Sequence, residues 1–314
     1  MQQEQNSKSE YRRGLAAAVG SSALWGVLPI YWRAIDAVDS WLIILYRILL
    51  AGIVCFLFAV YRRGCEGVRE PLRQKGVALR YFVSGILITL NWSTYIWAVN
   101  AGHVIEASIG YYIEPLVVSL FGVLIFRERM GQAKKLAIAL VFCAVIVMMI
   151  HFKRPPMISL TLAASFAAYA VVKKKYAMPP ELSLLYETMF QMPVALCAIL
   201  YLEWTGKGAL SMTETPLQYV LLLLCGIVTA VPLLIFSYAA SRIRFVTLGI
   251  SQYISPTLTL LLGIFFFREA FDKVQLGAIL LIWVGIVFFT VGEFREAGLQ
   301  PGTEKEDLCE TPEI

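Results

Sequence analysis

The stretch YIEPLVVSLFGVLIFRE at residues 112–128 returns at residues 253–269 as YISPTLTLLLGIFFFRE, at a constant spacing of 141 residues. The tyrosine, isoleucine, proline and glycine match, and so does the closing Phe-Arg-Glu, without any gap. Weaker matches at this or a neighbouring spacing pair Gly85 with Gly226 and Arg47 with Glu187. The repeat indicates two copies of one structural unit. We place them at 15–152 and 153–291, between an N-terminal tail, 1–14, and a C-terminal tail, 292–314.

The composition favours a membrane protein. The chain of 314 residues is 59% hydrophobic and 16% charged, with a mean hydropathy of +0.70, which leaves too little polar surface for a water-soluble globule. Apolar segments near the length of about 20 residues that spans a bilayer recur along it. They are 15–32, 41–60, 81–99, 107–126, 136–150, 157–172, 182–202, 218–240, 248–267 and 274–291. A β-barrel would show alternating segments instead, so we predict an all-α polytopic protein with ten transmembrane helices.

The number of helices in each copy decides how the copies are oriented. Five is odd, so the second copy must enter the membrane upside down relative to the first. Two inverted five-helix repeats are typical of secondary transporters, in which the two halves exchange conformations around a central site. The repeat therefore predicts alternating access.

Lysine and arginine are distributed unequally between the two sides. With a cytoplasmic N-terminus, the inside segments collect 20 of these residues and the outside loops hold 6. Because positive charge gathers on the cytoplasmic side, both termini are predicted to be cytoplasmic. This distribution also accounts for the net charge of +5, so no nucleic-acid partner is expected.

Three stretches carry a resemblance to a known family. They are LWGVLPIYWR at 24–33, NWSTYIWAVNAGHVIEASIGYYIEPL at 91–116 and TAVPLLIFSYAASRI at 229–243. The chain resembles the RarD family of EamA-type transporters, in the drug/metabolite transporter superfamily. The resemblance implies a ten-helix inner-membrane permease of the kind named for chloramphenicol sensitivity. Where family members usually carry asparagine before the proline of the fourth helix, this chain has Glu114.

Charged residues inside the apolar segments are the first candidates for a binding site. At about 1.5 Å of rise per residue, Arg47 and Glu114 lie at one depth in the outer half of the membrane. An unpaired charge there costs about 2.5–3.5 kcal/mol, so the two are expected to pair, either to lock helices together or to line the transport path. The residues expected to contact the substrate are Arg47, Asn91, Trp92, Tyr95, Tyr112, Glu114, Gln252 and Tyr253.

Glu187, the repeat counterpart of Arg47, lies at the mirrored depth in the inner half and is a candidate for proton coupling, with Glu114 as the second. No basic residue is expected beside Glu187 at its own depth. The alternative is a structural pair of Glu187 with Arg47 or with one of the lysines at 173–175, which could reach it from the cytoplasmic edge. Four tryptophans at outer helix ends are interpreted as an interfacial belt. They are Trp32, Trp41, Trp97 and Trp204.

These observations favour a permease that moves a small organic metabolite or drug, with protons as a candidate driving ion. A passive channel or a membrane scaffold is the alternative. An enzyme is not expected, because no HExxH, GxSxG or phosphate-binding GxxxxGK[ST] motif occurs. No cofactor or metal is expected either, and formation of a homodimer is left open.

Overall fold

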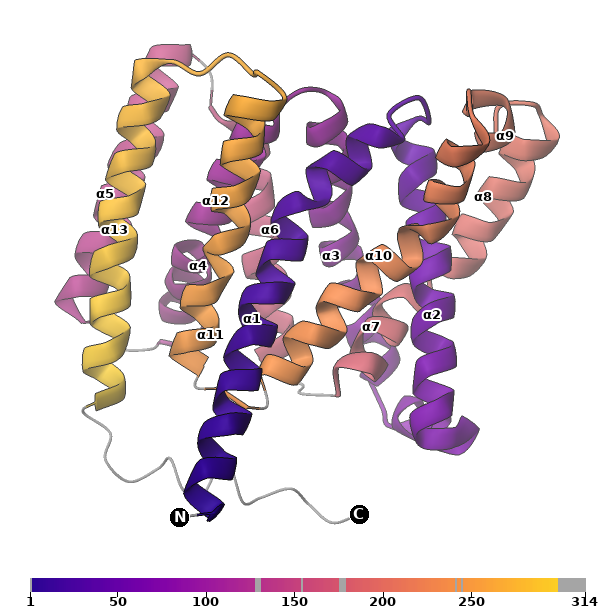
Figure 1. The fold of residues 1–314 in the computed structure, drawn as a ribbon, viewed down its shortest axis with the longest axis horizontal. Helices are drawn as coiled ribbons and strands as arrows, with labels where there is room; N and C mark the ends of the chain where they lie inside the picture. The colour runs from indigo at the N-terminus through magenta and orange to yellow at the C-terminus, as the bar shows by residue number, and fades with distance from the viewer. Residues whose placement is uncertain are drawn as a thin grey trace. The chain divides into compact units, whose positions relative to one another are not determined.

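The computed structural model describes residues 2–127, 131–153, 155–174, 179–240, 242–243 and 245–298, and all regular elements within these ranges are helices (Figure 1). The first half holds α1 (Gln2–Ala34), α2 (Ser40–Arg69), η1 (Glu70–Arg73), α3 (Val77–Asn100), α4 (Val104–Phe126) and α5 (Gln132–Phe152). The second half holds α6 (Met157–Lys174), α7 (Pro180–Met189), α8 (Met192–Trp204), α9 (Ala209–Met212), α10 (Pro216–Ala240), α11 (Phe245–Gln252), α12 (Ile254–Leu261), η2 (Leu262–Phe266) and α13 (Lys273–Gly298). The prediction of an all-α protein is confirmed.

Eight of the described helical segments are long and apolar enough to cross a membrane. A ninth span results if α7 and α8, which meet at a bend of 52°, are taken together. Among the predicted ten, the segment in α6 is the exception, since its apolar helix is shorter than the others. The apolar runs of the sequence therefore locate the spans.

The predicted tails differ from the structure at one end. Residues 2–14 were expected to form a tail but continue α1 without a break, so this helix begins well before its apolar stretch. At the other end α13 extends to Gly298, and residues 299–314 of the predicted C-terminal tail lie outside the described part of the chain.

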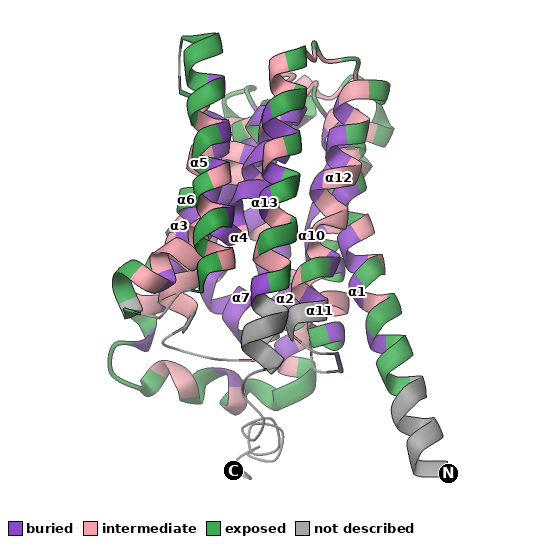
Figure 2. Cartoon of the chain, turned by 90° about the vertical axis from the view of Figure 1, so that its left-hand side faces the viewer, coloured by how far each residue is buried: buried purple, intermediate pink, exposed green. Residues whose placement is uncertain are grey.

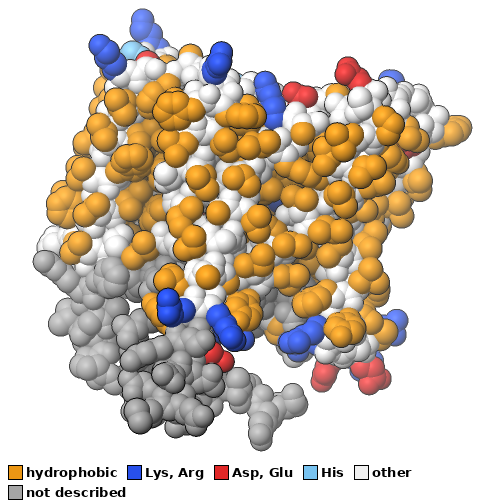
Figure 3. All heavy atoms as spheres, in the orientation of Figure 1, with side chains coloured by type: hydrophobic (Ala, Val, Ile, Leu, Met, Phe, Trp, Pro, Cys, Tyr) orange, Lys and Arg blue, Asp and Glu red, His pale blue; other side chains and the backbone are white. Residues whose placement is uncertain are grey.

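The outward-facing side chains are apolar, as expected for a protein solvated by lipid. Leu57, Phe142 and Phe265 are among many large apolar residues exposed on the helices. Buried and exposed stretches alternate along each helix in Figure 2, because each helix turns one side toward its neighbours. In Figure 3 hydrophobic side chains cover the middle of the face, while lysine, arginine and the acidic residues gather at its upper and lower edges. This pattern fits a membrane-embedded surface.

The chain forms two compact units, and each contains equivalent segments of both sequence repeats. One unit comprises residues 1–121 and 156–271, and the other comprises 122–155 and 272–314. In the first unit α1 packs on α10 and α3 packs on α6. The second unit is built on the pair α5 and α13. The units therefore do not follow the boundary between the repeats.

Two glycines that are repeat counterparts each allow two helices of the first unit to touch. A Cβ atom on Gly85 of α3 would collide with the backbone of Glu187 in α7. A Cβ atom on Gly226 of α10 would lie 2.5 Å from the carbonyl carbon of Leu50 in α2. Both contacts are backbone contacts that only glycine permits at this separation.

The segments that carry the opening repeat run in opposite directions. The carboxylate of Glu269, just after η2, accepts hydrogen bonds from the backbone N–H groups of Val104 (2.7 Å) and Ile105 (2.9 Å) at the start of α4. The end of the α11–α12–η2 segment thus meets the beginning of α4. The counterparts Arg127 and Arg268 also share a rare backbone conformation, with φ of 55° and 54°.

Within the described residues, one span of the second repeat is broken and another is interrupted at a single residue. Between α7 and α8 the N–H of Gln191 bonds to the carbonyl of Thr188 (2.9 Å) instead of that of Glu187. The side-chain amide of Gln191 donates to the Glu187 carbonyl instead (3.0 Å). Pro193, which has no N–H to continue the ladder, follows at once. Tyr253 alone interrupts the helix between α11 and α12, and Leu248–Phe266 still forms one span. Glu187 therefore lies in the last turn before a break.

A capping box begins α13 in the second unit. Oδ1 of Asp272 accepts from the N–H groups of Val274 and Gln275 (both 2.8 Å), and Oε1 of Gln275 accepts from the N–H of Asp272 (3.0 Å). Oδ2 of Asp272 pairs with His151 at the end of α5 (2.9 Å). The backbone N–H of Gln275, together with His151, lowers the pKa of Asp272.

Candidate functional site

Arg47 is the centre of a buried group that we call the arginine cluster, made of Trp32, Arg47, Trp92 and Thr229. The Arg47 side chain is only 7% exposed, although it carries a charge. Its Nε donates to the hydroxyl of Thr229 on α10 (3.0 Å). Its guanidinium carbon lies 4.1 Å from the ring centre of Trp92 and 5.4 Å from that of Trp32. Helices α1, α2, α3 and α10 thus each contribute one residue.

The expected ion pair between Arg47 and Glu114 is not formed. No carboxylate of the described residues lies within 4.0 Å of Arg47, and Oε2 of Glu114 is buried without a hydrogen-bond partner. Tyr111 is close enough to interact electrostatically with both charged groups. Equal depth does not bring the two side chains together, because depth along a helix does not determine the direction in which a side chain points.

The expectation that four tryptophans form an interfacial belt is wrong for Trp32. Trp41, Trp97 and Trp204 are exposed, as a belt requires, but Trp32 is fully buried. Its ring packs edge-on against Tyr31, with centroids 4.9 Å apart, and its indole N–H has no hydrogen-bond partner among the described residues. Trp32 is therefore part of the arginine cluster.

Asn91 links helices of the two repeats. Its side-chain amide donates to the carbonyl of Leu162 (2.8 Å) and to the hydroxyl of Ser165 (3.1 Å), both on α6. Tyr95, one turn further along α3, is buried and packs on Tyr111, with ring centroids 5.3 Å apart. These contacts place Asn91 in the α3–α6 interface. They place Tyr95 beside Tyr111, which interacts with both Arg47 and Glu114.

The repeated tyrosines meet each other. The rings of Tyr112 and Tyr253 stack with centroids 6.5 Å apart and an angle of 18° between their planes. The Tyr112 hydroxyl shares a hydrogen bond with that of Thr257 (2.8 Å). Gln252 is half-buried beside this pair in the sequence. The tyrosines thus join α4 to the junction between α11 and α12.

A second buried group, the glutamate cluster, surrounds Glu187. Glu187 is 2% exposed, and its Oε1 lies 2.8 Å from Nζ of Lys173. The same oxygen accepts from the hydroxyls of Ser183 (2.9 Å) and Ser84 (3.2 Å), and both carboxylate oxygens lie 3.3 Å from the hydroxyl of Tyr169. Lys173 also bonds to Ser183. The expectation that no basic residue lies beside Glu187 is wrong, and the alternative of a pair with a lysine is confirmed for Lys173.

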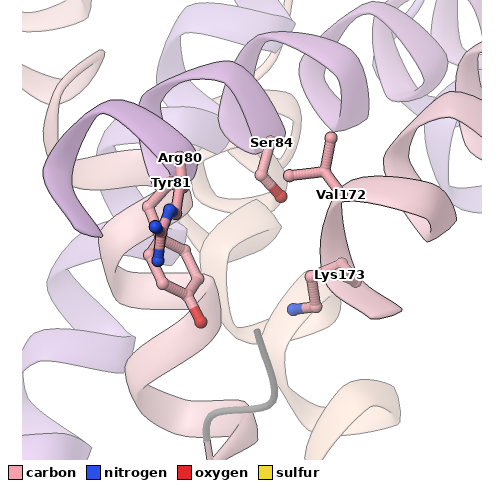
Figure 4. A pocket seen from close by; sticks show the side chains of 5 residues that line it. All are labelled: Arg80, Tyr81, Ser84, Val172 and Lys173. Carbon is pink, nitrogen blue, oxygen red and sulfur yellow. The ribbon is translucent and has the colours of Figure 1, made fainter. Parts of the chain in front are cut away.

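A small pocket adjoins this cluster. Figure 4 shows its lining, with Arg80, Tyr81 and Ser84 from α3 facing Val172 and Lys173 from α6. The Ser84 hydroxyl and the Lys173 ammonium group point toward the same gap. Another pocket, beside the arginine cluster, is lined by Arg47 and Trp92 together with the hydroxyls of Thr89 and Ser93 and three isoleucines. Each has a cavity volume of about 10 Å³, which is room for about one water-sized sphere. A ligand of drug size needs about 300 Å³ or more, so the helices must part to admit one.

The two clusters are related by the sequence repeat. Arg47 and Glu187 are counterparts at a spacing of 140 residues, and Trp32 and Lys173 are counterparts at a spacing of 141 residues. The residue that contacts Arg47 from α1 thus corresponds to the residue that pairs with Glu187 from α6. Sequence reasoning missed Thr229, Ser84, Tyr169 and Ser183, which are ordinary small or aromatic residues of apolar helices. Lys173 is one of the three lysines that the sequence left open as partners of Glu187.

No group of metal-ligating side chains occurs in the described ranges. The polar groups of both clusters are hydroxyls, one guanidinium, one ammonium and one carboxylate, which suit hydrogen bonding and charge recognition. These groups can bind a polar or charged ligand.

Comparison with known proteins identifies the family. A model of the EamA-like transporter family matches residues 12–150 and again residues 155–291. The chain is 37% identical to "Protein RarD" of Streptomyces exfoliatus, covering 93% of this chain and 92% of the relative. It is 36% identical to "Protein RarD" of Escherichia coli strain K12, covering 89% and 94%. It is 34% identical to "Uncharacterized transporter YojE" of Bacillus subtilis strain 168, covering 91% and 96%.

A solved crystal structure shares the fold, with a TM-score of 0.57 at 18% identity over 88% of this chain and 97% of the other. These relatives are bacterial and are named as a transporter or as RarD. Together with the apolar spans, this makes the chain a multi-pass inner-membrane transporter. The expected resemblance is confirmed: the chain belongs to the EamA-like transporter family, in the drug/metabolite transporter superfamily, with relatives named RarD.

Proposed function

We propose that the protein is a secondary active transporter that moves a small organic metabolite or drug by alternating access. In this proposal ten transmembrane segments form two inverted five-helix repeats, 15–152 and 153–291. The observation that carries the proposal is the repeat relation between the arginine cluster and the glutamate cluster. Two related polar clusters, one in each half of the membrane, can close the path alternately when the repeats exchange conformations.

Three further observations support the inversion. The spans that carry the repeated motif run in opposite directions, because Glu269 caps the start of α4. Gly85 and Gly226 hold equivalent helix pairs in close contact. Arg127 and Arg268 share a left-handed backbone conformation that non-glycine residues rarely adopt. The last two observations are pairs of sequence counterparts with one structural role each.

The broken helices support a moving path. Glu187 lies in the last turn before the break between α7 and α8, and Tyr253 is the single residue that interrupts the helix between α11 and α12. Discontinuous helices place polar backbone groups and hinges near transported substrates in many carriers. The substrate path is therefore proposed to pass between the stacked tyrosines and the two clusters.

Membrane orientation is a prediction of its own. The excess of lysine and arginine on one side predicts that both termini are cytoplasmic. A green fluorescent protein fused after Gly298 is expected to fluoresce, and alkaline phosphatase fused there is expected to be inactive. The opposite pair of results would place the C-terminus outside, which with a cytoplasmic N-terminus requires an odd number of spans and excludes the proposed ten.

Counterflow in proteoliposomes tests transport. Vesicles loaded with one unlabelled compound from a metabolite and drug panel should take up the labelled form transiently against its gradient. A passive channel would give only downhill equilibration, and a membrane scaffold would give no uptake. Compounds for the panel are chosen by their ability to raise the thermal midpoint of the purified protein, because a ligand of the folded state stabilises it.

Proton coupling is assigned to Glu114 in preference to Glu187. Glu187 already has a counter-ion and three hydroxyl partners, whereas Glu114 is buried with one oxygen unpartnered. Burying an unpaired carboxylate is costly, and binding a proton removes that cost. Glu114→Gln is therefore expected to abolish accumulation driven by a pH gradient while leaving counterflow intact.

The matched control is Glu66→Gln, which makes the same change on the exposed side of α2 and is expected to keep both activities. If the Glu114→Gln protein still accumulates substrate when a pH difference is imposed, Glu114 does not couple protons. Loss of pH-driven accumulation in Glu187→Gln alone would return that role to Glu187. A homodimer, left open by the sequence, is not required by this mechanism.

A further inference from the structure

We infer that Arg47 recognises an oxyanion of the substrate, most simply a carboxylate, held end-on by the two terminal nitrogens of its guanidinium group. This inference rests on the proposed transport function and names the chemical class of the substrate. The positive charge of Arg47 is buried without a negative partner in the described part of the chain. Arg47 is 7% exposed, and no carboxylate of the described residues pairs with it.

Stacking on two tryptophan rings offsets only part of the cost of burying the Arg47 charge. Its guanidinium group lies over the Trp92 ring at 4.1 Å and near the Trp32 ring at 5.4 Å. Contacts of this kind attract the cation but supply no negative charge, and an arginine without a counter-ion is costly at membrane depth. A negative ligand would supply the missing interaction.

The hydrogen bonds of Arg47 leave one recognition edge open. Its Nε is engaged by the Thr229 hydroxyl at 3.0 Å, which fixes the plane of the group. The described residues offer no further hydrogen-bond partner to its terminal nitrogens, and Arg47 lines the pocket with Trp92, Thr89 and Ser93. Two parallel N–H donors on one edge match the two oxygens of a carboxylate. Lysine could not reproduce this geometry.

A second donor in the same cluster also lacks a partner. The indole N–H of Trp32 is fully buried and has no hydrogen-bond partner in the described part of the chain, although Trp32 packs against Arg47. Buried donors are nearly always satisfied in folded proteins. An unsatisfied donor beside an unpaired cation is the arrangement expected of a site that an anion completes. The isoleucines of the pocket, such as Ile44 and Ile96, favour an apolar body behind the charged group.

The test uses the full-length protein in detergent and a series of matched probes: benzoate, phenylacetate and 3-phenylpropionate, each compared with its primary amide. Binding is followed by tryptophan fluorescence and by the thermal midpoint. At least one carboxylate is expected to change both signals at a concentration where its amide changes neither. Arg47→Met is expected to weaken binding of that carboxylate about 10- to 100-fold, and Arg47→Lys at least about tenfold.

Two further variants separate recognition from folding. Thr229→Val keeps the arginine but removes the acceptor that orients it, and is expected to weaken carboxylate binding while preserving the folded protein. Arg62→Met removes an exposed arginine from the same helix and is expected to bind as the parent protein does. If Arg47→Met does not fold, Thr229→Val and Arg47→Lys still decide the outcome.

Three results would overturn the inference: amides that bind as well as the carboxylates, binding that survives in Arg47→Met, or no response to any carboxylate of the series. Counterflow of the labelled probes is measured separately. Carboxylate binding that depends on Arg47 without counterflow would contradict the proposed function and leave the recognition intact. Counterflow that is the same for acid and amide would contradict carboxylate recognition by Arg47 and leave the proposed transport function intact.

Discussion

Replacing Lys173 by methionine is expected to lower the free energy of unfolding by about 3–5 kcal/mol, the range for removing one partner of a buried ion pair. Lys173 Nζ lies 2.8 Å from a carboxylate that is 2% exposed. The variant leaves this carboxylate buried without its counter-ion. The hydroxyls of Ser84, Ser183 and Tyr169 still donate to it, so the lower end of the range is expected. Unfolding in a denaturing-detergent titration measures the loss.

A double-mutant cycle provides the decisive comparison for this pair. Glu187→Gln in the Lys173→Met background removes the uncompensated charge and should recover part of the stability. Lys75→Met, at an exposed position after η1, serves as the control for loss of a lysine and should change stability little. Losses that simply add in the double variant would contradict the pair as a source of stability.

Gly85→Ala is expected to destabilise the protein by about 1–3 kcal/mol, the usual range for overpacking. The new methyl group would collide with the backbone of Glu187, which cannot rotate away as a side chain can. Separating α3 from α7 would also stretch the bonds that Ser84 makes to the glutamate cluster. Gly226→Ala is expected to act in the same direction, because its Cβ would meet the backbone of Leu50. Thermal unfolding of the purified variants measures both effects.

The matched control, Gly20→Ala, is expected to change stability in the opposite direction. Gly20 lies within α1 with open space around the position of a Cβ atom. Gly20→Ala is therefore expected to raise stability by up to about 1 kcal/mol through helix propensity alone. If Gly85→Ala stabilises the protein as Gly20→Ala does, the close contact of α3 with α7 is not present in the folded protein.

Hydrophobicity and the repeat predicted the helices but not which side chains meet. Long apolar runs such as 41–60 must become helices in a membrane, because unpaired backbone groups are too costly there. The position of the break at Gln191 depends on a side-chain hydrogen bond that no apolar pattern reveals. Pro193 alone does not identify it, since Pro115 and Pro232 lie within helices that continue.

The failure of the predicted Arg47–Glu114 pair has a specific cause. Rise per residue gives the depth of a side chain but not its direction around the helix axis or the identity of the neighbouring helix. Arg47 instead contacts residues from α1, α3 and α10. Trp32 illustrates the same limit, since a place near the end of a helix is compatible with an interfacial position or with full burial. Contacts between helices distant in sequence require the three-dimensional packing.

The contact between Tyr112 and Tyr253 has a consequence for movement. These residues are copies of each other, and copies related by a two-fold axis can touch only beside that axis, as in a symmetric dimer interface. If the two repeats exchange conformations, the surroundings of Tyr112 and of Tyr253 are interchanged, and the two states of the pair are related by the two-fold rotation. The tyrosine pair would then stay in place during the transport cycle. A spectroscopic probe at the pair would report almost no change, while Trp32 takes over the role of Lys173 and Lys173 takes over that of Trp32.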